Sequence, residues 1–188
     1  MRKKLFYISY VLGVILLFFG ASVVQGFETE QNQIYEKLKI YSFTPTDDSY
    51  LDEWQPEKIR GSGISMKTRN TGSAGYACDA ILRFDISSIP PDTSIVYATL
   101  KLYYYKWWDN NPSGRLNKIY RVTSDWDEVT ASWNNQPSYA STTTSTSSVP
   151  SYTGIWMEFD VLNDVLNFIN GTYLNYGWRI KDENYGRG

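Results

Sequence analysis

Alternating apolar and polar residues mark two neighbouring segments near the middle of the chain. In residues 80–86 and again in residues 98–105, the even-numbered positions are apolar or tyrosine, and most odd-numbered positions are polar. Successive side chains of a strand point to opposite faces of a sheet, so each segment is predicted to be a half-buried strand. Pro90 and Pro91 cannot donate a hydrogen bond to a sheet, which places them in the connection between the two strands.

Two later segments, residues 118–123 and 176–181, alternate in the same way and are also predicted to be strands. The side chains expected to face the core are Tyr120 and Val122 in the first segment, and Trp178 and Ile180 in the second. Between them, residues 138–153 consist largely of serine and threonine, without an apolar period. We predict a polar surface loop there.

A change of period near the C-terminus predicts a helix. Residues 156–161 still alternate, but the apolar residues of 162–169 lie on one helical face, and Gly171 is a natural C-cap. The expected helix covers residues 163–170. Many short strands separated by turns, together with one short helix, predict an all-β fold, an antiparallel β-sandwich of jelly-roll type.

The N-terminus has the pattern of an export signal. Basic residues 2–4 precede an apolar run over residues 5–19, and small residues follow up to Gly26. This order is typical of a cleaved signal peptide, and cleavage would give a secreted or cell-surface protein with no membrane contact. The predicted division is a signal peptide at 1–26, a leader segment at 27–41 and the domain at 42–188. An uncleaved anchor is the alternative, because residues 5–24 are long enough to span a bilayer.

Charge and residue usage exclude several functional classes. The formal net charge is −2, and it becomes −5 without residues 1–26, which hold three basic residues and no acidic ones. A mildly acidic protein is a poor candidate for nucleic-acid binding. Histidine is absent, which excludes a Ser-His-Asp triad and a histidine-ligated zinc site. Cys78 is the only cysteine, so we interpret it as a buried small apolar residue.

Aromatic residues make up 16% of the chain, and aromatic rings stack on the C–H-rich faces of sugars. Most of them are expected in the core, but outward-facing positions carry a second set. If the strands concerned share a sheet, one face combines rings and cations in a way that suits an anionic polysaccharide. The alternative is a solvated face whose residues simply favour strands. The candidate ligand-binding residues are Arg83, Lys101, Tyr103, Tyr105, Trp107, Arg179 and Lys181.

Trp107 is the strongest of these candidates. It lies with Trp108 beside polar residues in a loop, where at least one of the two indoles must be partly exposed. An exposed aromatic cluster usually marks an interaction site.

Acidic residues cluster at 47–48, 52–53 and 125–128. Carboxylates in such loops hold structural Ca²⁺ in many extracellular sandwiches, but turns and helix caps explain them more simply. No spacing singles out a pair that would act as the acid and base of a glycosidase. We therefore predict no catalytic residues, no metal site and no cofactor, with structural Ca²⁺ left open.

Five motifs together resemble one family of β-sandwiches. They are LRFDISSIP (82–90), ATLKLYY (98–104), WDEVTASWNNQP (126–137), FDV (159–161) and NYGWRIKD (175–182). The set is similar to the DNRLRE-type domain, which includes alginate-binding carbohydrate-binding modules and the disaggregatase-related repeats of archaeal surface proteins. The resemblance implies a jelly-roll sandwich with a short helix near its end. It also implies that the domain is truncated at its C-terminus, because family members continue into further strands.

Two functional hypotheses follow from the resemblance and the residues. The first is a secreted, non-catalytic carbohydrate-binding module for an acidic, uronate-containing polysaccharide. The second is a structural or adhesive cell-surface domain without a specific sugar site. An enzyme of the lyase or glycosidase type is disfavoured, because no constellation of catalytic groups is visible.

Overall fold

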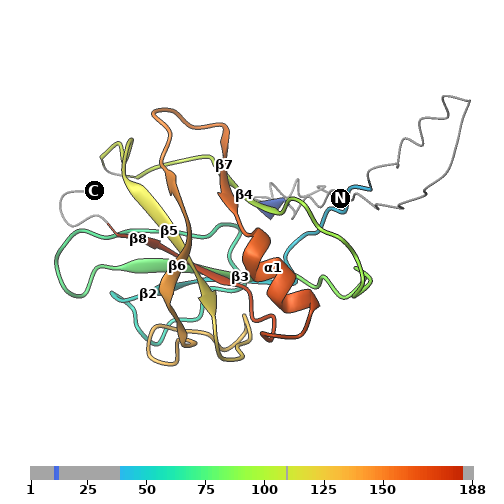
Figure 1. Cartoon of the computed structure of the whole chain (residues 1–188). Helices are drawn as coiled ribbons and strands as arrows, with labels where there is room; N and C mark the ends of the chain where they lie inside the picture. The colour runs from blue at the N-terminus through green and yellow to red at the C-terminus, as the bar shows by residue number, and fades with distance from the viewer. Residues whose placement is uncertain (1–10, 13–38, 109, 184–188) are drawn as a thin grey trace, which may run out of the picture.

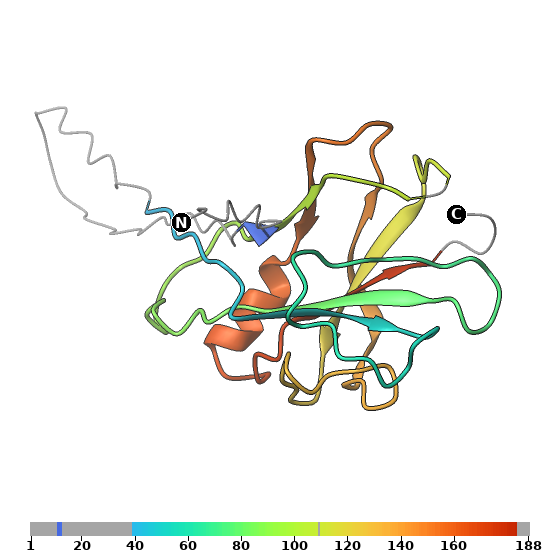
Figure 2. The ribbon, with the colours of Figure 1, turned by 180° about the vertical axis from the view of Figure 1, so that it is seen from behind.

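The chain folds into two β-sheets packed face to face, with one short helix (Figure 1, and Figure 2 from behind). The computed structural model describes residues 11–12, 39–108 and 110–183. The three-stranded sheet has the order β1 (Val11–Leu12), β4 (Thr99–Tyr104) and β7 (Ile155–Asp160). The five-stranded sheet has the order β2 (Asp47–Asp52), β3 (Cys78–Arg83), β8 (Trp178–Asp182), β5 (Leu116–Val122) and β6 (Tyr139–Ser148).

All neighbouring strands in these sheets are antiparallel. The predicted antiparallel all-β sandwich is therefore confirmed. The predicted short helix is also confirmed as α1 (Leu162–Ile169), one residue from the expected position at its start and at its end.

Most of the N-terminal region lies outside the described residues. This applies to the predicted signal peptide (1–26) and leader (27–41), apart from residues 11–12 and 39–41. Residues 11–12 form β1, which pairs with the edge of β4. Within the described part of the chain, we find no helix with the length and apolar character needed to cross a membrane.

The space between the sheets holds the main hydrophobic core, and the period-two pattern accounts for it. Leu82 of β3 and Leu100 of β4 are fully buried in this core. Trp178 of β8 and Phe168 of α1 lie there too, with their ring centroids 5.5 Å apart. A shift of one residue in register would move such side chains into water. The predicted inward faces of residues 80–86 and 98–105 are confirmed.

A second hydrophobic cluster covers the opposite face of the five-stranded sheet. Its buried members are Leu51, Ile81, Val122, Trp126 and Ala131. Two of them come from the connection between β5 and β6, so this connection folds back over the sheet. The prediction that Tyr120 and Val122 face the main core is wrong: Ile119 faces it, and Val122 packs in the second cluster. Alternation did not fix the orientation of β5 because both of its faces are buried.

The prediction of a polar loop over residues 138–153 is also wrong. Tyr139–Ser148 form β6, which pairs with β5 at the edge of the five-stranded sheet. An edge strand is held by backbone hydrogen bonds and does not need an apolar face, and threonine favours extended backbone. The hydroxyl of Thr144 also donates to Asp164 of α1 (2.6 Å), which ties the strand to the helix.

Candidate functional site

The sequence-predicted binding residues lie on two different sheets. Lys101 and Tyr103 belong to β4 in the three-stranded sheet, whereas Arg83 lies on β3 and Arg179 on β8 in the five-stranded sheet. The condition for a single aromatic and cationic face was that these strands share a sheet. That condition is not met, so the expectation of one continuous face is wrong.

The two arginines of this set are engaged in ion pairs. Arg179 is only 2% exposed, and its Nε donates to Oδ2 of Asp79 (2.8 Å), with Nη2 at 2.5 Å from the same oxygen. The ring of Tyr139 covers the guanidinium at 4.5 Å. Burial raises the pKa of the Asp79 carboxyl, and the charge of Arg179 partly offsets this effect. Arg83 pairs with Asp47 (3.0 Å) and also with Asp125. Arg179 is therefore not available to a ligand in this structure.

The two lysines of the set also have partners. Lys101 lies 2.5 Å from a carboxylate oxygen of Glu158 on β7. Lys181 donates to the hydroxyl of Tyr139 (3.0 Å). On the outer face of the three-stranded sheet, Tyr103 packs beside Trp156, with centroids 4.9 Å apart.

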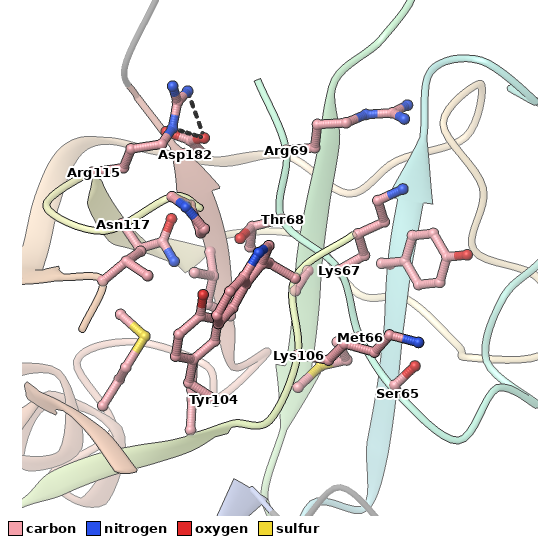
Figure 3. A pocket seen from close by; sticks show the side chains of 18 of the residues that line it. Ser65, Met66, Lys67, Thr68, Arg69, Tyr104, Lys106, Arg115, Asn117 and Asp182 are labelled. Carbon is pink, nitrogen blue, oxygen red and sulfur yellow. Dashed lines mark hydrogen bonds and ion pairs between the residues drawn. The ribbon is translucent and has the colours of Figure 1, made fainter. Parts of the chain in front are cut away.

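A cavity of about 360 Å³ opens at one end of the sandwich, and we call it the end cavity (Figure 3). Residues 65–70, from the connection between β2 and β3, line one side of it. Residues 102–108, from the end of β4 and the loop after it, line another. In Figure 3, Asn117 and Asp182, near the start of β5 and the end of β8, face the 65–70 segment across the cavity.

Aromatic rings form the rim of the end cavity. Trp107 is 37% exposed and Trp108 is 69% exposed, so the expectation that this loop presents an indole to solvent is confirmed. Trp107 is stacked on Tyr104, with centroids 6.3 Å apart and an interplanar angle of 26°. The ammonium group of Lys106 lies 3.6 Å from the centroid of Trp108. Three of the predicted residues line the cavity: Tyr103, Tyr105 and Trp107.

The end cavity is also electropositive. Its described lining holds four cations, Lys67, Arg69, Lys106 and Arg115, against one carboxylate, that of Asp182. Arg115 is paired with this carboxylate at 2.7 Å. Arg69 is oriented by a hydrogen bond from its Nε to the backbone oxygen of Tyr76 (2.6 Å). The described lining therefore carries three more cations than carboxylates, while Arg69 also lies 3.9 Å from the carboxylate of Asp52, outside the lining.

Sequence reasoning missed Lys67 and Arg69. They lie in a glycine-rich connection, for which alternation gives no orientation. The available signal was two basic residues separated by one position, Lys67-Thr68-Arg69, in a chain of acidic net charge. That signal is too common on protein surfaces to single out a site.

Three acids of the sequence clusters, Asp47, Asp52 and Asp125, are used in ion pairs with arginines. Asp47 pairs with Arg83, and Asp52 with Arg60. Among the described residues, no group of three or more histidines, cysteines or acids is arranged to hold a metal ion. Cys78 is a free, fully buried thiol, as interpreted from the sequence.

The comparison with known families agrees with this geometry. Residues 39–187 match carbohydrate-binding module family 96, which is most of the chain. The chain therefore belongs to carbohydrate-binding module family 96. No curated protein matches the sequence.

Proposed function

We propose that the protein is a secreted, non-catalytic module that binds an acidic, uronate-containing polysaccharide at the end cavity. Membership of a carbohydrate-binding family supports the sugar, and the resemblance of its motifs to alginate-binding domains of the DNRLRE type favours a uronate polymer. The observation that carries the proposal is the combination of exposed indoles and an excess of cations around one cavity.

The two kinds of side chain have separate tasks in this proposal. Trp107 and Trp108 offer ring faces on which a pyranose stacks, an interaction that does not depend on the charge of the sugar. Lys67 and Arg69 attract the carboxylate of a uronate, and the planar guanidinium of arginine matches the geometry of that group. Affinity for sugars in general and selection of acidic sugars therefore come from different residues.

Non-catalytic binding is proposed because the described lining of the end cavity lacks a pair of acid and base groups. Asp182 is the one carboxylate of its described lining, and it is paired with Arg115. Hydrolysis of a glycosidic bond ordinarily needs two carboxyl groups on either side of that bond. We also propose that binding needs no metal ion, since the carboxylates of Asp47 and Asp52 are engaged by arginines.

A structural or adhesive domain at the cell surface is the second candidate. The observation in its favour is that the predicted outward cations of the strands are paired within the protein, as in Lys101 with Glu158. A domain of this kind would show no measurable affinity for defined sugars.

Affinity electrophoresis in gels containing alginate, polygalacturonate or a neutral glucan separates these candidates. Trp107→Ala is expected to weaken binding to every polymer that the parent binds, by about 1–3 kcal/mol for a residue of this kind. The matched control is Trp54→Ala, which removes an indole that is 59% exposed but lies outside the end cavity. Lys67→Gln is expected to weaken uronate binding alone, with the exposed Lys58→Gln as its control.

Each outcome decides between the candidates. A parent that migrates unretarded in all three gels favours the structural domain. If the parent binds and Trp54→Ala weakens binding while Trp107→Ala does not, the binding site is not the end cavity. Retardation in the neutral glucan equal to that in both uronate gels would contradict the proposed preference for acidic sugars.

A further inference from the structure

Two polar side chains occupy inward-facing positions at the end of the sandwich, where a sandwich core is normally apolar. Asn117 lies two residues before the fully buried Ile119 on β5, and Tyr104 lies two residues after Leu102 on β4. Because side chains alternate along a strand, both point into the space between the sheets. Both line the end cavity.

Asn117 is a largely buried residue whose side-chain amide has no hydrogen-bonding partner among the described residues. The residue is 7% exposed, and its side chain makes no hydrogen bond within the part of the chain that the structure describes. Buried amides almost always have a hydrogen-bonding partner, because burial without one costs free energy. Figure 3 shows the amide directed into the cavity. Its two hydrogen-bonding groups are therefore open to a molecule bound there.

Tyr104 adds a second polar group at this end of the sandwich, with a hydroxyl that is itself buried. This hydroxyl has no partner among the described residues. Burial raises the pKa of the Tyr104 phenol, so the hydroxyl keeps its proton and remains a donor at neutral pH. Trp107, stacked on the same ring, holds Tyr104 in place and belongs to the rim.

The end cavity is closed at its inner side by the main core. Ala80, Met157 and Ile180 form this wall, and all three are buried. Its volume, about 360 Å³, is near the lower end of the range for ligand pockets, roughly 300–1,000 Å³. A sugar chain that enters the cavity end-on therefore meets buried core side chains at its floor and stops there.

We propose that the end cavity recognises the end of a uronate chain, and that the Asn117 amide and the Tyr104 hydroxyl hydrogen-bond the terminal sugar residue inside it. The inference rests on the proposed function and deepens it, because it specifies the form of the ligand. Trp107 and the cations at the rim then contact the next sugar residues of the same chain.

Competition binding on the unmodified protein tests the chain-end form of the ligand. Oligouronates of one to six sugar residues and the intact polymer compete for binding at equal mass. Since hydrolysis multiplies chain ends, short oligouronates are expected to compete better per unit mass than the polymer, and affinity should stop rising at about two to three sugar residues. An affinity that keeps rising with chain length, with the polymer the best competitor, would overturn the inference and leave the proposed function standing.

The variant Asn117→Leu tests the amide itself. An apolar side chain of similar size removes an unpaired buried amide, so the melting temperature should stay the same or rise, while affinity for short oligouronates falls about tenfold or more. Tyr104→Phe is expected to behave in the same way. The control is Asn163→Leu on the exposed face of α1, which should leave oligouronate affinity unchanged.

The outcomes are distinct. Parent-like affinity of Asn117→Leu for the oligouronates, or a melting temperature clearly below that of the parent, would assign Asn117 a structural role and overturn the inference. A parent that binds no uronate ligand of any length would instead defeat the proposed function, and the chain-end inference with it.

Discussion

Replacing Arg179 by methionine is expected to destabilise the fold and to leave the ligand preference unchanged. Arg179 and Asp79 face each other with side chains that are 3% and 4% exposed, and they share two close contacts. Methionine keeps an unbranched, apolar stem in place of the first part of the arginine side chain but removes the charge and the donors. The Asp79 carboxylate would then be a buried charge without its counterion.

The magnitude follows from that burial. Removing one partner of a buried ion pair typically costs about 3–5 kcal/mol, because the other charge stays desolvated. For a domain of roughly 150 residues, each kcal/mol lowers the melting temperature by about 2–4 °C, so a loss near 10 °C is expected. The double variant Asp79→Leu with Arg179→Met removes both charges and should recover most of the loss, since apolar replacement of a whole buried pair is often neutral.

Urea unfolding followed by circular dichroism measures these differences for the parent, the single variant and the double variant. A single variant within about 1 kcal/mol of the parent would refute the reasoning, because the pair would then carry no desolvation penalty. Parent-like stability combined with weaker binding to acidic polymers alone would refute it more strongly. That result would make Arg179 a ligand-binding residue, as its outward position in the strand pattern first indicated.

Substitutions at three further positions test other parts of the fold. Gly177→Ala is expected to lower the free energy of unfolding by at least about 2 kcal/mol. Gly177 has φ +77°, and an added Cβ would lie 2.0 Å from the backbone oxygen of Leu82. Parent-like urea unfolding would contradict this expectation. Asp164→Ala should lower the free energy of unfolding by about 1–3 kcal/mol, and Asp164→Asn should lower it by less. The reason is that Asp164 accepts a hydrogen bond from Nε1 of Trp178 (2.8 Å). Equal losses for the two variants would rule out this hydrogen bond as the cause. Burial raises the pKa of the Cys78 thiol from 9.0 to about 11, so the unfolded chain loses this proton first and stability should fall as the pH rises from about 9 to about 11. Cys78→Ala should reduce that slope, and an unchanged slope in pH-dependent urea titrations would contradict the assignment.

The parts of the fold that the sequence predicted are those with one buried face. In residues 80–86 and 98–105, alternation gave both the strands and their inward sides, because Leu82 and Leu100 contact the main core. The helix near residue 165 was predictable for the same reason, since Val165 and Phe168 are its buried residues. A local sequence pattern is enough to predict a helix or strand and its buried side wherever burial follows the period of that single element.

The parts of the fold that the sequence did not predict depend on contacts between segments that are distant along the chain. β3 and β4 are consecutive in the chain, yet they lie in different sheets, and no local pattern encodes that choice. The second cluster exists because residues 123–138 fold back onto Ile81 and Val122. Trp107 was found as a candidate because a polar loop must expose part of an indole pair. Asn117 was not found, because its unpaired amide is visible only when its neighbours are known.

The acidic net charge of the chain bears directly on how an acidic polymer would reach the end cavity under the proposed function. At physiological salt, charges on the surface are screened over about 8 Å, so a carboxylate inside the cavity interacts mainly with the lining cations. The rest of the polymer would lie outside, over a protein whose formal net charge is −2, or −5 without residues 1–26. Attraction is thus local, whereas mild repulsion extends over the remaining surface and grows as salt is lowered. A chain that places only its end against the cations would gain the attraction with the least repulsion, which is the mode of binding that we propose for the end cavity.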